Sequence, residues 1–320
     1  MRPALSIVVP VYCNRETLAP LLTETRKAFD GKLATGAWEI VFVDDGSVDD
    51  SLQVLRELQR RHPLDVRVVR LSRNFGSHAA ILAGLSRCAG RYAAVIGADL
   101  QEHPSLVLEM FDKARADDAE VVLACRAGRE EGWSKVAFAN AYYWIMRRFS
   151  QAKFPAGGFD CFLIARPVID ALLRQPEANT SIAALILWMG FRQATVEYTK
   201  AARAAGESRW TLRKKLRLVL DSVMSFSHAP IRAMELTGLL TAGAGLAYAG
   251  AIVGMRIFGW REVEGWASLM VVVLVMSGLL LLALGVVGEY LWRILDAARR
   301  RPVFVIAESW EGDESSPPAG

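Results

Sequence analysis

The amino-acid sequence predicts an α/β fold with a mostly parallel sheet, followed by a pair of long apolar helices. Two observations carry this prediction. Over residues 5–126, short β-branched runs alternate with segments whose apolar residues recur at helical spacing. In the last third of the chain, two long runs contain no charged residue.

The first part of the chain is predicted to hold five strands with four helices between them. The predicted strands are LSIVVPVY, EIVFVDDG, VRVVRLS, YAAVIGAD and EVVLACR. Near-continuous apolar strands separated by helices are typical of a parallel sheet that helices cover on both faces. Ligands of such sheets bind beyond the carboxyl ends of the strands. The polar residues at these ends, which we expect to line one crevice, are Asp44, Asp45, Arg73, Asn74 and Asp99.

The composition excludes several classes of protein. The 38 Lys and Arg residues exceed the 34 Asp and Glu residues by too little for a dedicated nucleic-acid-binding protein, so no nucleic-acid partner is expected. The four cysteines are scattered and form no CxxC pair, so neither a disulfide framework nor a zinc site is expected. The hydrophobic content of 52% is high for a soluble protein.

The two uncharged runs are long enough to cross a membrane. The first lies between Glu235 and Arg256 and would be about 30 Å long as a helix, which matches the hydrocarbon core of a bilayer. The second, residues 265–288, would reach about 36 Å, enough to span with some tilt. We therefore predict transmembrane helices at about residues 235–257 and 266–289. The alternative is a pair of helices buried in a protein core.

The charges around these runs predict their orientation. Basic residues cluster before the first run and after the second, whereas the loop between the runs is balanced in charge. By the positive-inside rule, both termini of a multi-pass protein of the bacterial inner membrane would face the cytoplasm. Trp260, Trp266 and Trp292 are placed like anchors at the membrane interface. The basic residues are Arg209, Arg213, Lys214, Lys215, Arg217, Arg293, Arg299, Arg300 and Arg301.

The strand ends lack the motifs of two common nucleotide-binding folds. No GxGxxG follows the first strand and no GxxxxGK[ST] occurs, which argues against a dehydrogenase and a P-loop protein. The second strand instead ends in VFVDDGSVDDS. An acid at this position can accept hydrogen bonds from a base or a ribose. The alternative is that Asp45 or Ser47 caps the helix that follows.

Four segments, in this order, resemble glycosyltransferase family 2 with its GT-A nucleotide-sugar domain: VVPVY, FVDDGSVDDS, RNFGSHAAILAGL and GADLQEHP. Three more resemble the polyprenyl-phosphate glycosyltransferases, the group of the dolichol-phosphate mannosyltransferases and bactoprenol glucosyltransferases. These are GGFDCFLIARPVID, GFRQATVEY and GESRWTLRKKLRLVLDSV, ahead of the two apolar runs. The resemblance covers about residues 4–305.

The resemblance implies roles for individual residues. It implies that Asp44 reads the uracil or ribose of the donor, that Asp99 holds Mg²⁺ or Mn²⁺ on the diphosphate, and that Asp160 is the catalytic carboxylate. Arg209 matches a basic residue on a loop near the phosphates, and Arg126 also fits the task of neutralising charge there. The other residues expected to contact the nucleotide are Pro10, Tyr12, Arg73, Asn74 and Gly76.

The chain departs from the family pattern at two places. Cys13 and Asn14 follow Tyr12 where the family usually reads Tyr-Asn-Glu, and Gly97 replaces the first acid of the family's D-x-D. A diphosphate supplies two oxygens and Mg²⁺ keeps several waters, so the site can be completed around Asp99.

Alternatives remain open for three of the candidate residues. Asp99 would otherwise cap the helix that starts at Pro104, and Asp160 would be a turn acid in PAGGFDC. His103 is either a further ligand of the cation or a turn residue.

The sequence divides into four regions. Residues 1–205 are the predicted cytoplasmic GT-A domain, 206–232 a juxtamembrane amphipathic segment, 233–293 the two membrane helices, and 294–320 a cytoplasmic basic segment with a disordered tail, ESWEGDESSPPAG, which begins at Glu308. Within the second region, RWTLRKKLRLVLD predicts a helix that lies on the membrane surface and meets anionic lipid phosphates. The alternative is that its charges only mark the topology.

Together these features predict a membrane glycosyltransferase of cell-envelope glycan synthesis or modification. It would move a sugar from a UDP- or GDP-sugar to a polyprenyl phosphate such as undecaprenyl phosphate, with inversion, and would use Mg²⁺ or Mn²⁺. The resemblance implies that a chain of this architecture can assemble as a homo-oligomer through its membrane helices, and the oligomeric state itself stays open. The alternatives are transfer to a hydroxyl of a glycan, and a degenerate nucleotide-binding scaffold in the membrane.

Overall fold

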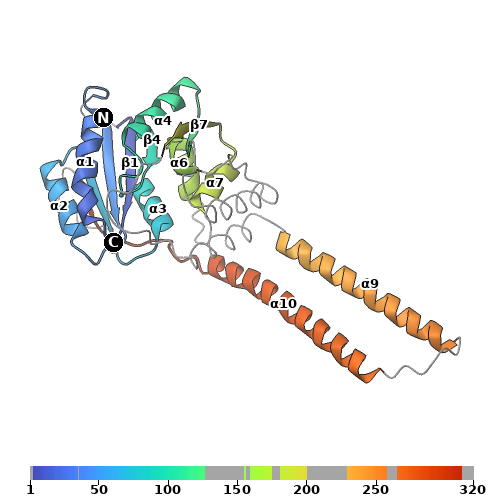
Figure 1. Cartoon of the computed structure of the whole chain (residues 1–320). Helices are drawn as coiled ribbons and strands as arrows, with labels where there is room; N and C mark the ends of the chain where they lie inside the picture. Colours follow the sequence, from blue (N-terminus) through green and yellow to red (C-terminus); the bar gives the residue numbers. More distant parts are fainter. Residues whose placement is uncertain are drawn as a thin grey trace.

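The structure, a computed structural model, describes residues 3–34, 36–126, 155, 159–174, 181–199, 229–257 and 265–311. An α/β domain is followed by two long helices that extend together away from it (Figure 1). The strands are β1 (Leu5–Val11), β2 (Trp38–Asp44), β3 (Val66–Leu71), β4 (Tyr92–Val95), β5 (Val121–Arg126), β6 (Phe159–Ala165), β7 (Gln193–Tyr198) and β8 (Ile306–Trp310). The helices are α1 (Arg15–Phe29), α2 (Ser51–Arg61), α3 (Ser77–Arg87), α4 (Ser105–Ala116), α6 (Arg166–Arg174), α7 (Ile182–Trp188), α9 (Ala229–Ile257) and α10 (Trp266–Ala298).

The described strands form one sheet in the order β7-β5-β6-β4-β1-β2-β3-β8. β1 pairs in parallel with β2 and β4, β2 with β3, and β5 with β7. The strands β6 and β8 run antiparallel to their neighbours. The predicted α/β fold with a mostly parallel sheet is confirmed, and the five predicted strands are β1 to β5.

Helices cover both faces of the sheet because successive strand residues point to opposite sides. Ile7 and Val9 of β1 belong to a core shared with α1, α2 and α4, whereas Val8 belongs to a second core shared with α3, α6 and α7. Every residue of β2 is buried. Since both faces are occupied, the loops beyond the strand ends are where a ligand can approach the sheet.

The chain that follows the second long helix returns to the sheet. β8 pairs with β3, with Glu308 opposite Arg70. At the carboxyl end of β3, the amide of Ser72 donates a hydrogen bond to the carbonyl oxygen of Val305 at 3.0 Å. The chain leaving α10 is therefore bonded to the strand that leads into the predicted nucleotide-binding segment.

This strand corrects one prediction. Residues 294–320 were expected to include a disordered tail that begins at Glu308, yet Ile306–Trp310 is a strand of the sheet. Its alternation of half-buried and exposed residues is the period of a strand, but five residues are too few for that pattern to be distinguished from chance. Residues 312–320 lie outside the described part of the chain.

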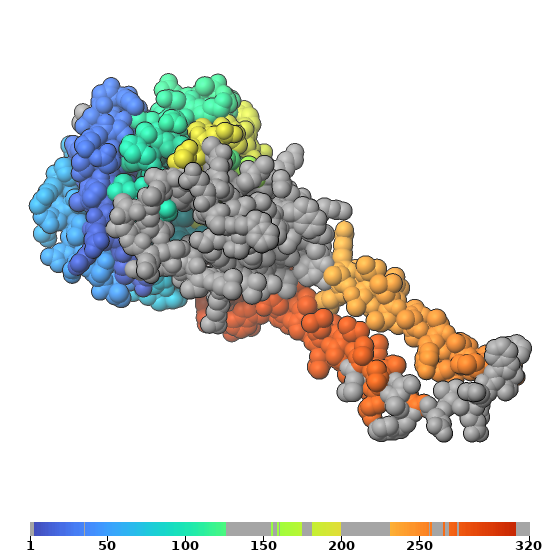
Figure 2. Space-filling view, in the orientation of Figure 1, coloured from blue at the N-terminus to red at the C-terminus, as the bar shows by residue number. Residues whose placement is uncertain are grey.

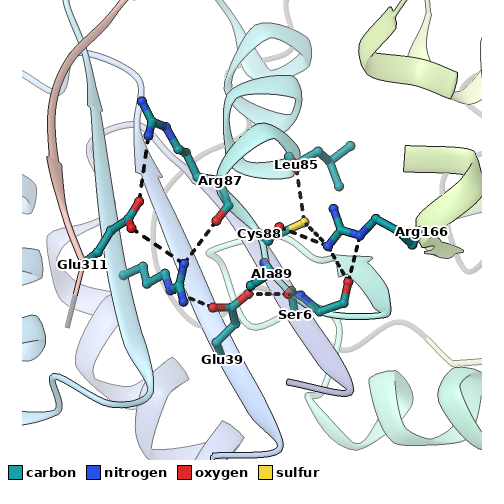
Figure 3. A network of polar contacts seen from close by, with 10 residues as sticks. Ser6, Glu39, Leu85, Arg87, Cys88, Ala89, Arg166 and Glu311 are labelled. Atoms are coloured by element: carbon teal, nitrogen blue, oxygen red, sulfur yellow. Dashed lines mark hydrogen bonds and ion pairs between the residues drawn. The ribbon is translucent and has the colours of Figure 1, made fainter. Parts of the chain in front are cut away.

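A polar network ties the end of the chain to the sheet (Figure 3). Arg67 of β3 forms ion pairs with Glu39, at 2.7 Å from its Nε, and with Glu311. Glu39 is buried and accepts hydrogen bonds from Ser6 Oγ at 2.5 Å and from the amide of Ala89 at 2.6 Å. A buried carboxylate is tolerated only where such partners replace its lost hydration. The network therefore links β1, β2 and β3 to the residue that follows β8.

Trp310 gives a test of this docking. The guanidinium of Arg56, from α2, lies 4.4 Å from the centroid of the Trp310 ring, which also packs against the core. We expect Trp310→Ala to lower the free energy of unfolding by about 1–2 kcal/mol, because it removes a cation–π contact and apolar packing. Thermal unfolding of the purified full chain measures this. Ser309→Ala, at an exposed position of the same strand, is the control; equal melting temperatures for the two variants would contradict the docking.

In the described part of the chain, α9 and α10 are long and apolar enough to cross a membrane, with 29 and 33 residues. Their apolar windows are not buried inside the protein, and the helices project from the rounded domain (Figure 2). The alternative of two core helices therefore does not hold. The second helix continues to Ala298, beyond the predicted end near residue 289.

Candidate active site

The carboxyl ends of β1, β2, β3 and β4 meet at one edge of the sheet. Val11 lies opposite Asp44 in the register of β1 and β2, so Pro10 and Tyr12 flank this acid across the strand pair. Asp44 is 1% exposed, and its Oδ1 accepts a hydrogen bond from the amide of Ser47 at 3.1 Å. The structure thus brings three of the predicted nucleotide-contacting residues to the ends of adjacent strands.

Two hydroxyl groups hold the loop after β1 against the loop after β2. The amide of Cys13 donates to Ser47 Oγ, and that of Asn14 donates to Ser51 Oγ, each at 2.9 Å. Cys13 has a φ of +54°, a left-handed conformation that costs a non-glycine residue of the order of 1 kcal/mol. The residues that depart from the family pattern are therefore placed by contacts with the neighbouring strand's loop.

Asp45 organises the loop after β3. Its Oδ1 accepts a hydrogen bond from the amide of Phe75 at 2.7 Å, and its Oδ2 accepts one from the amide of Gly76 at 2.9 Å. Burial raises the pKa of Asp45, while these two hydrogen bonds act in the opposite direction. Neither Asp45 nor Ser47 caps α2, which follows Asp50, so that alternative is wrong. Sequence reasoning missed the role of Asp45 because it depends on a contact between two loops.

Gly46 lets the same two loops touch. Its φ is +69°, and a Cβ at this position would lie 2.7 Å from the backbone C of Arg73 and 2.7 Å from the backbone N of Asn74. No side chain fits there, so Arg73 and Asn74 lie directly beside the end of β2. The guanidinium of Arg73 lies 4.1 Å from the centroid of the Phe75 ring. The predicted residues 73, 74 and 76 are thus brought beside Asp44.

Asp99 lies in the loop after β4. Its Oδ1 accepts a hydrogen bond from the amide of Gln101 at 3.3 Å, which closes a tight turn. Thr17 Oγ1, from α1, donates to the carbonyl oxygen of Ala98 at 2.5 Å and holds the same loop. The residue that precedes α4 is Pro104, so the alternative that Asp99 caps this helix is wrong.

His103 is held at the start of α4. Its Nδ1 lies 2.9 Å from Ser105 Oγ and accepts a hydrogen bond from the Ser105 amide at 3.2 Å, while Nε2 lies 3.8 Å from a carboxylate oxygen of Glu24. The contacts at Nδ1 are those of a turn residue, whereas 3.8 Å at Nε2 is too long for a hydrogen bond. We do not assign His103 to a cation.

The loop after β4 offers carboxylate oxygens beside Gly97. A Cβ at Gly97 would lie 3.0 Å from Asp99 Oδ1 and 3.1 Å from Glu102 Oε2. Mg²⁺ and Mn²⁺ prefer oxygen ligands, and Mg²⁺ is commonly held by one or two carboxylates plus phosphate and water. Within the described ranges, no group of three or more His, Cys, Asp or Glu residues could hold a metal ion. The residues present fit a divalent cation that shares its shell with a diphosphate.

The remaining predicted residues lie on or beyond the other half of the sheet. Asp160 is near the amino end of β6, and this strand runs antiparallel to β4 and β5, so its backbone reaches the same edge as Asp99. Arg126 is the last residue of β5, opposite Tyr198. Arg209 lies outside the described residues.

This edge, on a sheet of this topology, agrees with the GT-A fold that the resemblance implies. The chain belongs to glycosyltransferase family 2: the family described as "Glycosyl transferase family 2" matches residues 6–173. The chain is 37% identical to the uncharacterized glycosyltransferase YkcC of Bacillus subtilis, over 95% of this chain and 94% of the relative. It is 33% identical to the bactoprenol glucosyl transferase of Shigella phage SfII, over 97% of this chain and 99% of the relative.

A solved structure agrees in fold. The mannosyltransferase PcManGT from Pyrobaculum calidifontis, in complex with GDP-Man and Mn²⁺, covers 87% of this chain with 81% of its own, with a TM-score of 0.50 and 17% identity. At this identity the likeness establishes the fold alone. With the family match, the chain is a glycosyltransferase, and the alternative of a degenerate scaffold is set aside.

Proposed function

We propose that this enzyme transfers a sugar from a UDP- or GDP-sugar to a polyprenyl phosphate at a membrane. The observation that carries the proposal is the joining of two features in one chain: a nucleotide-sugar edge on the sheet and a pair of exposed apolar helices. The near full-length similarity to a bactoprenol glucosyl transferase, which extends across both helices, supports this acceptor. A chain with both features can bring a water-soluble nucleotide sugar to an acceptor that is dissolved in the membrane.

The chain's own residues would position the donor. Asp44 accepts hydrogen bonds from the base or ribose, and Arg73 and Asn74 close over the nucleotide from the loop that Asp45 holds. Asp99 would hold the divalent cation, which neutralises charge on the diphosphate leaving group. Arg126, and Arg209 on the juxtamembrane segment, serve the same electrostatic task.

The acceptor phosphate needs no strong base from the protein to become a nucleophile. A phosphate monoester has a second pKa of about 6, so its oxygen is largely ionised at pH 7. This oxygen forms a bond to the anomeric carbon while the bond from that carbon to the diphosphate breaks, and the nucleoside diphosphate leaves with the electron pair. Attack from the opposite side inverts the configuration. Asp160 then serves to orient the acceptor or the sugar, and alignment contributes most of the catalysis.

The pairing of β8 with β3 supports a hairpin topology. One partner strand precedes both long helices and the other follows them, so both ends of the helical pair lie on one side of any membrane that the helices cross. The basic residues at these ends make that side the cytoplasm of a bacterial inner membrane. Within the proposal, copies of the chain associate through α9 and α10.

The test is a transfer assay. Membranes that contain the protein are incubated with a panel of labelled UDP- and GDP-sugars and undecaprenyl phosphate, and the lipid fraction is examined for a labelled product that the anomeric NMR coupling shows to be inverted. One donor of the panel should label the lipid. Label that enters only a glycan, or no lipid product with any donor, would overturn the proposed acceptor.

The loop contact of Asp45 gives a second test. We expect Asp45→Asn to weaken binding of UDP or GDP by roughly tenfold, because an amide group would set a donor against the Gly76 amide and leave one hydrogen bond unmade. Isothermal titration measures the affinity, and Asp30→Asn, an exposed acid at the end of α1, is the matched control. Unchanged affinity in Asp45→Asn would show that the loop does not shape the nucleotide site.

A further inference from the structure

The side chain of Glu102 lies where the missing acid of the family motif would be. Its Oε2 and the Oδ1 of Asp99 both come within about 3 Å of the point where a Cβ at Gly97 would stand. Since the two distances are 3.0 and 3.1 Å, the two oxygens are at most about 6.1 Å apart. Real Cβ atoms rarely approach oxygens this closely, so the carboxylates occupy the space that a side chain at position 97 would need.

The backbone of the loop explains how residue 102 returns to position 97. Leu100 has a φ of +57°, a left-handed conformation that non-glycine residues adopt only where other contacts enforce it. The turn between Asp99 and Gln101 and the hydrogen bond from Thr17 supply such contacts. The reversal at Leu100 carries Glu102 back over the end of β4.

The side chain of Glu102 is buried, and a hydrogen bond from Tyr198 orients its carboxylate. It is 4% exposed, and its Oε1 lies 3.5 Å from the hydroxyl of Tyr198, which donates to it from the end of β7. This contact leaves Oε2 on the side of Gly97 and Asp99.

We propose that Glu102 supplies the second carboxylate of the divalent-cation site and replaces the acid that Gly97 lacks. The inference rests on the proposed nucleotide-sugar chemistry. Glycine at position 97 suits this arrangement, because a Cβ there would lie about 3 Å from the carboxylate oxygens of both Glu102 and Asp99 and would press on them. The site then offers the cation two negative side chains, as an intact D-x-D motif would.

The test measures cation binding without sugar transfer. Mn²⁺ is titrated into the purified full chain in the presence of UDP and, separately, of GDP, and free Mn²⁺ is followed by electron paramagnetic resonance. Glu102→Gln keeps the shape of the side chain and should weaken Mn²⁺ binding at least tenfold. Glu109→Gln removes the same charge from an exposed position of α4 and should leave the affinity unchanged.

A rescue separates ligation from a structural role. Glu102→Ala should lose Mn²⁺ affinity, whereas Gly97→Asp combined with Glu102→Ala should recover it to within a few-fold of the original chain, because the new acid takes the vacated space. Gly97→Asp alone places its Cβ against Glu102 and should not improve binding. Melting temperatures identify variants that bind poorly because they unfold.

Each outcome bears on the proposal. Unchanged Mn²⁺ affinity in Glu102→Gln, a folded double variant without recovery, or no Mn²⁺ binding by the original chain with either nucleotide would overturn it. A failure of the proposed acceptor looks different, since Mn²⁺ binding would still depend on Glu102 while no lipid product forms. Conversely, lipid transfer with Mn²⁺ binding independent of Glu102 would leave the proposed function intact and remove this role.

Discussion

Replacement of Asp99 by alanine is expected to reduce sugar transfer by about 100- to 1,000-fold, the usual loss when one charge-stabilising group is removed from an active site. The carboxylate lies at the end of β4, on the edge where the donor diphosphate is proposed to bind. Without it the cation site loses a ligand, and charge on the leaving group is less well neutralised. Because the reaction needs no strong base, this charge is the main electrostatic obstacle.

The measurement compares initial rates of lipid-linked sugar formation over a range of Mn²⁺ concentrations. In the proposed membrane topology, Asp99→Ala should still be recovered in the membrane fraction, because α9 and α10 are unchanged. Asp112→Ala, an exposed acid on α4, is the matched control and should keep the original rate. Transfer by Asp99→Ala with the original Mn²⁺ dependence would refute the assignment. Since Asp99 also accepts the Gln101 amide, circular dichroism must show that the variant is folded.

Gly46→Ala is the second substitution with a large expected effect. A methyl group at this position would overlap the backbone of Arg73 and Asn74 at 2.7 Å, and the residue would keep a left-handed φ of +69°. Backbone overlap and the left-handed strain together should cost about 2–4 kcal/mol of stability. Because the overlap falls on the nucleotide-binding segment, the KM for the donor should also rise.

Gly31→Ala separates these two costs. Gly31 has a similar φ of +75°, but a Cβ there meets nothing within 4 Å. It should therefore lose only the strain of the left-handed conformation, about 1–2 kcal/mol, and keep the original donor KM. Thermal unfolding and donor titration of both variants measure the difference. Equal effects at the two positions would contradict the close approach of the two loops.

The fold could be predicted wherever strands are buried on both faces. β1 and β2 are continuous apolar runs, and their type and order follow from the sequence. β7 is half-exposed, β8 has five residues, and β6 runs antiparallel to both of its neighbours, β4 and β5. Local periodicity is weak in such strands, because pairing partners far along the chain decide whether they form.

Some residues of the candidate site could likewise be predicted from the sequence, and others could not. Asp44, Arg73 and Asp99 could be placed at one edge because each follows a strong strand. The roles of Asp45 and Glu102 depend on how one loop meets another, through the amides of the loop after β3 and through the reversal at Leu100. The spacing of residues in the sequence does not indicate which loops come into contact in the fold.

The return of β8 to the sheet has a consequence for biosynthesis. A nascent chain can assemble β1 to β4 early, but β3 remains an unpaired edge until both apolar helices have been made and released from the ribosome. An open edge invites pairing with other chains, and domains generally fold as they emerge. In the proposed membrane topology, insertion of the hairpin would precede completion of the sheet, and a chain interrupted between α10 and β8 would leave the edge of β3 open to aggregation.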